Sequence, residues 1–190
     1  YAMLRAANTF YIDPTGGNDL NPGTEAQPWQ TLSEIGNRTL AQGAQILLKG
    51  GETFSVPHTF HVPIPNGGGT HADPIVFSSY GTGKATISPS SLPATSGDVT
   101  RHFCFDLEAE TGNAFIFDSL IFNGWDFVQQ NPRGSSGGPW DLNGAIRAYR
   151  VQDIIIRDCE FIGGTTGKGI GNAYDVSCHI TARYHEYNAF

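Results

Sequence analysis

Charged side chains are scarce in this sequence, and basic ones are scarcest. Only 15% of the 190 residues are Asp, Glu, Lys or Arg, and 18 acidic against 11 basic residues give a formal net charge of −7. A nucleic-acid-binding surface needs clustered Lys and Arg to neutralise phosphates. The composition therefore argues against a nucleic-acid partner.

Long apolar runs are also missing. No stretch approaches the roughly 20 apolar residues that a membrane-spanning helix needs, so we expect no membrane span. Hydrophobic residues nevertheless make up 39% of the chain, which is too many for an intrinsically disordered segment. A chain of this length and composition is typical of one domain with its own core.

Cysteine is rare and odd in number. Cys104, Cys159 and Cys178 are spaced unlike any zinc-binding pattern. Three interpretations stay open for them: small apolar side chains of the core, a disulfide between Cys159 and Cys178, or a catalytic thiol.

Helical periodicity is confined to one short segment near the N-terminus. Residues 10–35, FYIDPTGGNDLNPGTEAQPWQTLSEI, begin with a β-type run that leads into a loop dense in Gly, Asn, Asp and Pro. Thr31 and Glu34 then match a capping box, and Gly43 is a plausible stop. We therefore predict a helix over 31–42. Its apolar face consists of Leu32, Ile35 and Leu40.

Short apolar runs that end in Gly, Asn, Asp or Ser fill the rest of the chain, as in a protein of many strands and turns. Two of them superpose: FIFDSLIFNGW (115–125) and IIIRDCEFIGG (154–164) each read as a strand, one polar corner residue and a second strand. The corner residues are Ser119 and Asp158. The inward positions are Phe115, Phe117, Leu120 and Phe122 in the first copy, and Ile154, Ile156, Cys159 and Phe161 in the second.

The spacing of these copies indicates a solenoid. The offsets are 117 − 77 = 40 and 156 − 117 = 39 residues, and a third copy starting at YDVSCHI (174–180) gives 176 − 154 = 22. Each unit would add one rung, and rungs would stack through main-chain hydrogen bonds. We predict an all-β parallel β-helix of about five rungs in a single domain. Residues 1–43 would form the N-terminal cap region and 44–190 the rungs.

Four segments carry a family resemblance: YIDPTGGNDLNPGTEAQPWQTL (11–32), GAQILLKGGETF (43–54), DPIVFSSYGTGKATI (73–87) and DIIIRDCEFIGG (153–164). In these the sequence resembles the right-handed parallel β-helix proteins of the pectate-lyase-like superfamily. The resemblance implies a right-handed solenoid whose N-terminal helix covers the first rung. It also implies an extracellular or cell-surface location, and a polysaccharide bound along one long sheet and the loops that lead into it.

Counting from the corner residues places that sheet at about 145–149 and 169–173. Ile146 would then point inward, and Arg147 and Tyr149 outward. In the next rung Ile170 would stack on Ile146, with Lys168 just before it.

A sugar-binding groove is one interpretation of this face. The loop 124–144 ahead of it offers Trp125, Trp140 and Asp141. Aromatic faces stack on pyranose rings, and Arg147 would pair with a uronate carboxylate. In a lyase, Lys168 would remove the proton beside that carboxylate, with a cation such as Ca²⁺ offsetting its charge. Alternatively, Trp140 anchors its own loop and Arg147 forms a surface ion pair.

Other candidate sites have weaker support. The spacing of His58, His61 and His71 fits no common metal site, so no protein-bound metal is predicted beyond Ca²⁺. Asp158, at its corner, is expected to bond neighbouring backbone groups rather than act as a general acid.

Three functions follow as hypotheses. The first is an extracellular carbohydrate-active protein, a polysaccharide lyase or glycoside hydrolase if it is an enzyme, that binds or cleaves an acidic polysaccharide. The second is a non-catalytic surface module, such as an adhesin or phage-spike segment. The third is a structural, self-assembling solenoid.

The C-terminal segment NAYDVSCHITARYHEYNAF (172–190) breaks the pattern. It starts a rung at Val176, but Arg183 then falls at 161 + 22, where an inward Phe is expected. An exposed terminal rung would leave unpaired strand edges. We therefore expect it to be covered by an aromatic tail, by further chain if this is the N-terminal part of a longer protein, or by another subunit, which would allow an open filament. The tail aromatics are Tyr184, Tyr187 and Phe190.

Overall fold

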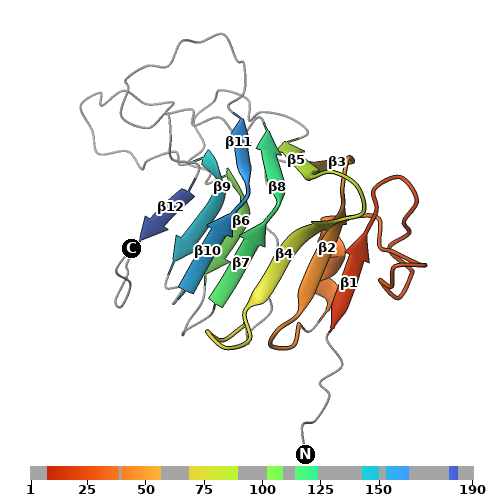
Figure 1. Ribbon diagram of the computed structural model, residues 1–190, viewed down its shortest axis with the longest axis horizontal. Coiled ribbons are helices and arrows are strands. Elements are labelled where there is room, and N and C mark those ends of the chain that lie inside the picture. The colour runs from red at the N-terminus through yellow and green to blue at the C-terminus, as the bar shows by residue number, and fades with distance from the viewer. Residues whose placement is uncertain are drawn as a thin grey trace, which may run out of the picture.

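The computed structural model describes residues 8–38, 40–56, 69–89, 102–108, 114–123, 143–149, 153–162 and 180–183. These residues form strands and one short 3-10 helix (Figure 1). The elements are β1 Thr9–Ile12, η1 Leu32–Asn37, β2 Gln45–Lys49, β3 Thr53–Val56, β4 Ile75–Tyr80, β5 Ala85–Pro89, β6 His102–Glu108, β7 Ala114–Asp118, β8 Leu120–Asn123, β9 Asn143–Tyr149, β10 Asp153–Arg157, β11 Glu160–Ile162 and β12 Ile180–Arg183.

The strands form three parallel sheets. The first sheet has the order β1-β2-β4-β7-β10, the second β11-β8-β5-β3 and the third β12-β9-β6. Along the chain, β4, β5 and β6 visit the three sheets in turn, and β7 to β9 and β10 to β12 do the same. Each such circuit is one rung, and the five strands of the first sheet match the predicted number of rungs (Figure 1). The fold is a parallel β-helix, as the sequence predicted.

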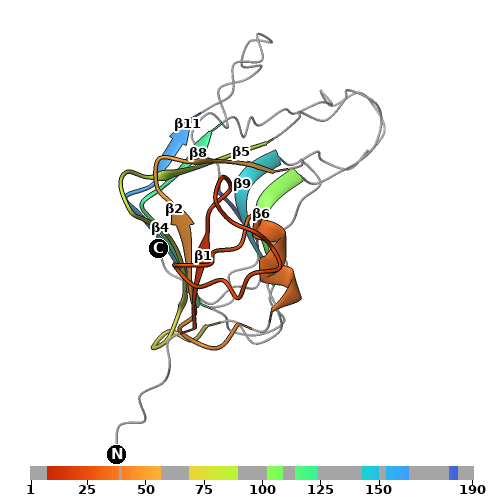
Figure 2. The same cartoon turned by 90° about the vertical axis from the view of Figure 1, so that its right-hand side faces the viewer.

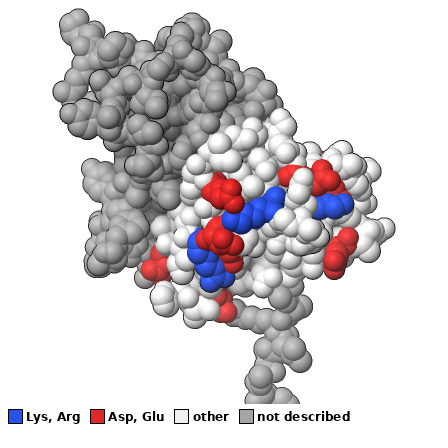
Figure 3. Space-filling view, turned by 45° about the horizontal axis from the view of Figure 1, so that its top comes forward, with Lys and Arg blue, Asp and Glu red and all other residues white. Residues whose placement is uncertain are grey.

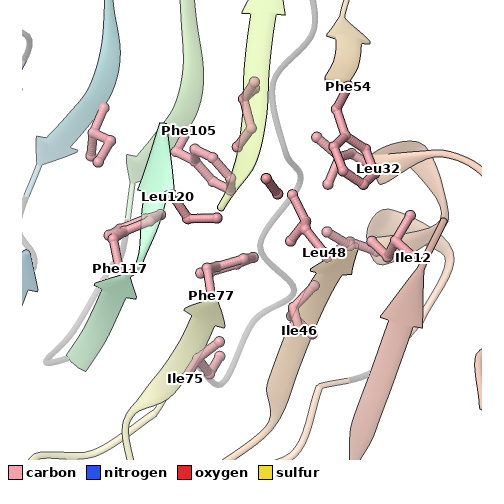
Figure 4. Close-up of a cluster of buried hydrophobic side chains, with 14 of the residues drawn as sticks. Ile12, Leu32, Ile46, Leu48, Phe54, Ile75, Phe77, Phe105, Phe117 and Leu120 are labelled. Carbon is pink, nitrogen blue, oxygen red and sulfur yellow. The ribbon is translucent and has the colours of Figure 1, made fainter. Parts of the chain in front are cut away.

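Stacked apolar side chains fill the space between the sheets. In the first sheet the printed register places Ile46, Phe77, Phe117 and Ile156 in one column. The Phe77 and Phe117 rings stack with centroids 5.2 Å apart, and Phe105 of the third sheet packs edge-on against both at 4.9 Å (Figure 4). The predicted pairing of Phe117 with Ile156 is confirmed. The inward positions predicted for both copies all belong to this core or pack against it.

The predicted corners are confirmed and have an unusual backbone. Ser119 has φ of 56° and Asp158 has φ of 52°, both in the left-handed region. A single residue can turn the chain from the first sheet into the second only with such a conformation, which non-glycine residues adopt at a cost. Beside this corner, the Ser79 hydroxyl donates to the Ser119 carbonyl at 2.6 Å and accepts the Ala85 N–H at 2.8 Å. The hydroxyl thus satisfies backbone groups of two adjacent rungs.

The predicted cap helix exists, but it is shorter than expected. It is a 3-10 helix over Leu32–Asn37, not a helix over 31–42. Gly36 and the β-branched Thr39 are poor helix formers, which accounts for the early end. Only part of the predicted apolar face belongs to the helix, since Leu40 lies beyond its end, but all three predicted side chains are buried in the core. These are Leu32, Ile35 and Leu40.

The predicted capping box is wrong. Thr31 occupies the N-cap position but makes no side-chain bond to the helix. Asp19 of the preceding loop accepts bonds from both the Thr31 N–H and its hydroxyl, each at 2.8 Å. Glu34 instead bonds Asn37 and Arg38 within the helix. Thr31 therefore bonds Asp19 of the preceding loop, and the predicted reciprocal bonds between Thr31 and Glu34 are not formed.

The polar loop before the helix closes the outer edge of β1. The Tyr11 N–H donates to the Gly23 carbonyl at 2.8 Å, and the Trp29 N–H donates to the Tyr11 carbonyl at 2.9 Å. The Trp29 indole is fully buried and donates to the Asn21 carbonyl. Seen from this end, β1, the loop and η1 lie across the end of the stack (Figure 2). The N-terminal end is therefore capped by main-chain bonds as well as by a helix.

Asp13 anchors this cap to the second rung. It is only 5% exposed, and its carboxylate accepts the N–H groups of Thr15 and Gly16 and lies 2.6 Å from Lys49 Nζ. Burial alone would raise the pKa of Asp13, but the bonds from Lys49, Gly16 and Thr15 together lower it below the ordinary 3.8. The bond to Asp13 raises the pKa of Lys49.

We expect Asp13→Asn to lower the free energy of unfolding by about 1 kcal/mol at neutral pH, because the partly exposed ion pair is lost. A depressed folded-state pKa gives stability that is present above the ordinary value of 3.8 and is lost as pH falls through the folded value. The gap between wild type and variant should therefore narrow below about pH 4. Urea unfolding across a pH series measures it. If the difference in unfolding free energy between wild type and variant instead grew as the pH fell, the lowered pKa of Asp13 would be wrong.

Cys159 is a free cysteine, so the Cys159–Cys178 disulfide is not formed. It is half-buried and packs against the core, which supports the interpretation as a small apolar side chain. Burial raises the pKa of the Cys159 thiol, although a backbone hydrogen bond with Leu120 opposes this. A raised pKa disfavours the reactive thiolate. Cys178 and the Cys104 side chain lie outside what the structure describes.

Candidate functional site

The third sheet carries the residues that the sequence assigned to substrate binding. Arg147 lies in β9 and pairs in register with Asp106 of β6 and Thr181 of β12. Two residues further along, a second row forms in the same way. It consists of Glu108, Tyr149 and Arg183.

Core residues alternate with these rows. Phe105 and Ile146 pair with each other and are fully buried. Successive positions of a strand alternate between its two faces, so the positions of Arg147 and Asp106 belong to the other face of the sheet. The predicted inward placement of Ile146 is confirmed. The side chains of Arg147 and Tyr149 lie outside the described part of the structure.

The next rung on this face was predicted wrongly. Ile180, not Ile170, pairs with Ile146, so the offset is 180 − 146 = 34 residues. Arg183 accordingly pairs with Tyr149 of the third sheet, and does not follow Phe161 in the second. The prediction of Ile170 assumed an offset of 170 − 146 = 24 residues, ten fewer than the chain has between the paired positions of β9 and β12. The placement of Lys168 beside this face relied on Ile170, and it loses that support.

The remaining predicted site residues fall outside the described residues. These are Lys168, Trp125, Trp140 and Asp141, together with the third repeat copy at Val176 and Cys178. Their contribution to a groove stays a prediction.

Sequence reasoning missed the two carboxylates of β6, Asp106 and Glu108. Residues 103–107 alternate as a strand does, but the sequence analysis did not align them with the strand at 145–149. The signal was available, because Phe105 and Ile146 are 146 − 105 = 41 residues apart, close to the offsets of 40 and 39 in the first sheet. Applying that offset would have placed Asp106 beside Arg147.

A second group of charges lies at the corner between the first and second sheets. Lys84 Nζ lies 3.0 Å from Glu160 and 3.3 Å from Asp158, and Arg157 pairs with Asp118 at 2.8 Å. Figure 3 shows these acidic and basic side chains side by side on one face. Burial alone would raise the pKa of Asp118, but its bonds with Arg157 and Ser119 lower it overall.

These corner charges are satisfied by one another, Arg157 with Asp118 in the adjacent rung and Lys84 with residues two rungs away, so they serve the stacking of the β-helix better than chemistry. Asp158 contacts the side chains of Lys84 and Ser119, at 3.3 and 3.2 Å, and not the backbone groups that were expected. Solvent screens exposed ion pairs of this kind, so each contributes little to stability.

The histidines give no metal cluster in the described ranges, where no three His, Cys, Asp or Glu side chains are placed to hold one ion. His71 lies 2.9 Å from Asp153, and His58 and His61 are outside those ranges. None of the helical residues that the structure describes forms a segment with the length and hydrophobicity that a membrane crossing requires.

No protein-family model matches this chain, and no curated protein matches it in sequence. Solved structures do resemble it. A rhamnogalacturonan lyase superposes with a TM-score of 0.60 over 83% of this chain at 18% identity. The GH136 lacto-N-biosidase of Eubacterium ramulus superposes with TM-scores of 0.52 over 78% of the chain and 0.51 over 82%, at 18% and 14% identity, in its selenomethionine and native structures.

The chain spans 36% of the lyase and 26% and 34% of the two lacto-N-biosidase structures. At these identities the likeness is one of fold. The parallel β-helix of this protein is thus shared with carbohydrate-active enzymes, one a lyase and the other a glycosidase.

Proposed function

We propose that this protein binds or cleaves an acidic polysaccharide on the face of its third sheet, outside the cell or at its surface. The observation that carries the proposal is the row in which Arg147 lies between Asp106 and Thr181. An arginine on a long sheet offers two parallel donors to a uronate carboxylate. The likeness of the fold to a lyase and a glycosidase supports a carbohydrate ligand.

In the lyase form of this proposal, Arg147 binds the substrate carboxylate and so acidifies the neighbouring C–H. A base then removes that proton, the bond between the next ring carbon and the glycosidic oxygen breaks as a C=C bond forms, and the departing oxygen takes a proton from water. The base is proposed from the sequence alone as Lys168, which lies outside the described residues, and Ca²⁺ would share the charge of the carboxylate with Arg147. Trp125, Trp140, Asp141 and Tyr149 would line the sugar path.

A glycoside hydrolase is the second candidate, and the two carboxylates of β6 favour it. Asp106 and Glu108 are alternate residues of one strand, so both positions belong to the same face of the sheet. Glycoside hydrolases use a pair of carboxyl groups, one as acid and the other as base or nucleophile. A hydrolase yields a new reducing end without an unsaturated sugar, so the two reactions are distinguishable.

We expect ultraviolet absorbance from an unsaturated product when the protein is incubated with one of four polymers: rhamnogalacturonan, pectate, alginate or a glycosaminoglycan. Arg147→Ala should reduce kcat/KM about a hundredfold, since the carboxylate loses its partner. Arg157→Ala is the matched control, because Arg157 lies in the first sheet and pairs with Asp118. It should retain the wild-type rate.

Other outcomes separate the alternatives. Reducing ends without absorbance would identify a hydrolase, and then Asp106→Asn and Glu108→Gln should abolish turnover. Binding without product, lost in Arg147→Ala, would identify a non-catalytic module. Neither binding nor product with any acidic polymer would refute the proposal, and wild-type activity in Arg147→Ala would remove that residue from the site.

A further inference from the structure

Two tyrosines lie together on the outer face of the first sheet, near the N-terminal cap. Tyr11 of β1 and Tyr80 of β4 are partly exposed, and their ring centroids are 5.0 Å apart with the ring planes at 89°. Ile12, the neighbour of Tyr11 in β1, is fully buried. Phe77 is fully buried three positions before Tyr80. Because successive strand positions alternate between the two faces, both tyrosines occupy outward positions.

The two rings converge over the strand between them. β2 separates β1 from β4 in the first sheet, so β1 and β4 are about 10 Å apart (Figure 1). The ring centroids are much closer than the strands, so the side chains lean toward each other across β2. Leu47 of β2 pairs in register with Tyr11. Lys49 of the same strand pairs with Tyr80. Tyr11 and Tyr80 thus form one tyrosine pair rather than two separate rings.

The hydroxyls of the tyrosine pair have no hydrogen-bond partner in the part of the chain that the structure describes. A phenol can both donate and accept a hydrogen bond. Burial raises the pKa of Tyr80 above its ordinary 10.0, and the charge of Asp13 raises it further while Lys49 opposes this. The Tyr80 hydroxyl therefore keeps its proton at neutral pH and can donate a bond to a ligand.

The charges around the tyrosine pair are mostly negative. The carboxylates of Asp13 and Glu25 both act on Tyr80. A third carboxylate, that of Glu52, acts on Lys49. Lys49 Nζ lies 2.6 Å from an Asp13 oxygen, so its positive charge is already offset. A carboxylated ligand would be repelled at this place, whereas a neutral ligand would not.

The apolar surface at the tyrosine pair is small and has a polar rim. Ser78, which pairs with Leu47, holds an outward position beside the rings, and the Lys49 side chain is 42% exposed. A typical protein partner covers about 800 Å² of each surface, far more than two phenol rings offer. The rings are also perpendicular, so they form no flat platform for a long stack. These features fit one small ligand unit.

We propose that the tyrosine pair binds one neutral sugar unit of a glycan, as a carbohydrate site separate from the third sheet. The apolar face of a pyranose would stack on one ring and meet the edge of the other. The sugar hydroxyls would bond the two phenols and the exposed ammonium of Lys49, which has three donors. The site lies on a different sheet from the proposed acidic-polysaccharide face, so each proposal can fail without the other.

Nuclear magnetic resonance of the full chain with carbon-13-labelled tyrosine rings tests the site in the wild type. The probes are β-1,4-linked trisaccharides of glucose, xylose, mannose and galactose, with trigalacturonate as the acidic counterpart. At least one neutral probe should shift the ring signals of Tyr11 and Tyr80, with a dissociation constant on the order of 1 mM. The signals are assigned with Tyr11→Phe and Tyr80→Phe. The other five of the seven tyrosines should not move.

Substitutions then measure the contribution of each ring. Tyr11→Ala and Tyr80→Ala should each raise the dissociation constant about tenfold, because one stacking surface is lost. Tyr80→Phe keeps the ring and its packing, and should raise the constant only about threefold through the lost hydroxyl. Ile116→Ala is the matched control. Ile116 holds an outward, partly exposed position of the same sheet, one strand beyond β4, and its loss should leave binding unchanged.

Three outcomes would overturn the proposal. The first is no shift of either ring with any neutral probe at about ten times the expected constant. The second is an equal shift of both rings by trigalacturonate, which would refute the preference for a neutral sugar. The third is a shift of both rings on dilution without any probe, which would assign the pair to a contact between copies. A shift of Tyr149 alone by trigalacturonate would support the third-sheet site and confirm that the tyrosine pair rejects acidic sugars.

Discussion

Replacing Phe117 with alanine is expected to lower the free energy of unfolding by about 3–5 kcal/mol. Phe117 is fully buried in β7, stacks on Phe77 at 5.2 Å and packs edge-on against Phe105 at 4.9 Å. Removing its ring leaves a cavity between two sheets whose strands are held by main-chain bonds on both sides. The surrounding rungs cannot collapse into that space without losing their register.

Urea denaturation followed by circular dichroism measures this loss. Leu20→Ala is the control, because Leu20 is 94% exposed in the N-terminal loop and should change stability by no more than about 0.5 kcal/mol. If Phe117→Ala were as mild as Leu20→Ala, the column of stacked side chains would not be the main source of stability.

Gly17→Ala is expected to destabilise the N-terminal cap by about 3 kcal/mol or more. A Cβ on Gly17 would lie 2.1 Å from the Trp29 carbonyl oxygen and 2.5 Å from the Asp13 carbonyl oxygen. Both are backbone atoms. The Trp29 carbonyl accepts the Asp13 N–H just after β1, and the Asp13 carbonyl accepts the Gly17 N–H within the turn. The clash can be relieved only by breaking those bonds.

Gly81→Ala provides the comparison. Gly81 has φ of +75°, but nothing lies within 4 Å of its added Cβ. Only the cost of the left-handed backbone applies there, about 1–2 kcal/mol. Thermal unfolding with tryptophan fluorescence reports on the cap, because Trp29 is fully buried in it. If Gly17→Ala and Gly81→Ala lowered the free energy of unfolding equally, the loop would not pack on β1 as described.

The sequence by itself determined the fold and the interior of the first and second sheets. Offsets of about 40 residues paired Phe77, Phe117 and Ile156 correctly, and the polar residues Ser119 and Asp158 marked the corners. These features are visible because a solenoid buries one residue in two and repeats the same pattern in every rung. Local patterns and their repetition are properties of the sequence.

The tertiary structure alone decided the contacts that depend on loops of unequal length. It paired Ile146 with Ile180 in place of Ile170, and it brought Asp106 beside Arg147. It also showed that the Thr31 hydroxyl donates to the Asp19 carboxylate of the cap loop, where the sequence had predicted a capping box with Glu34. In the first two cases the register is set by main-chain bonds between rungs. The sequence does not show where a loop ends and the next strand begins, so it does not show which residues of neighbouring rungs pair.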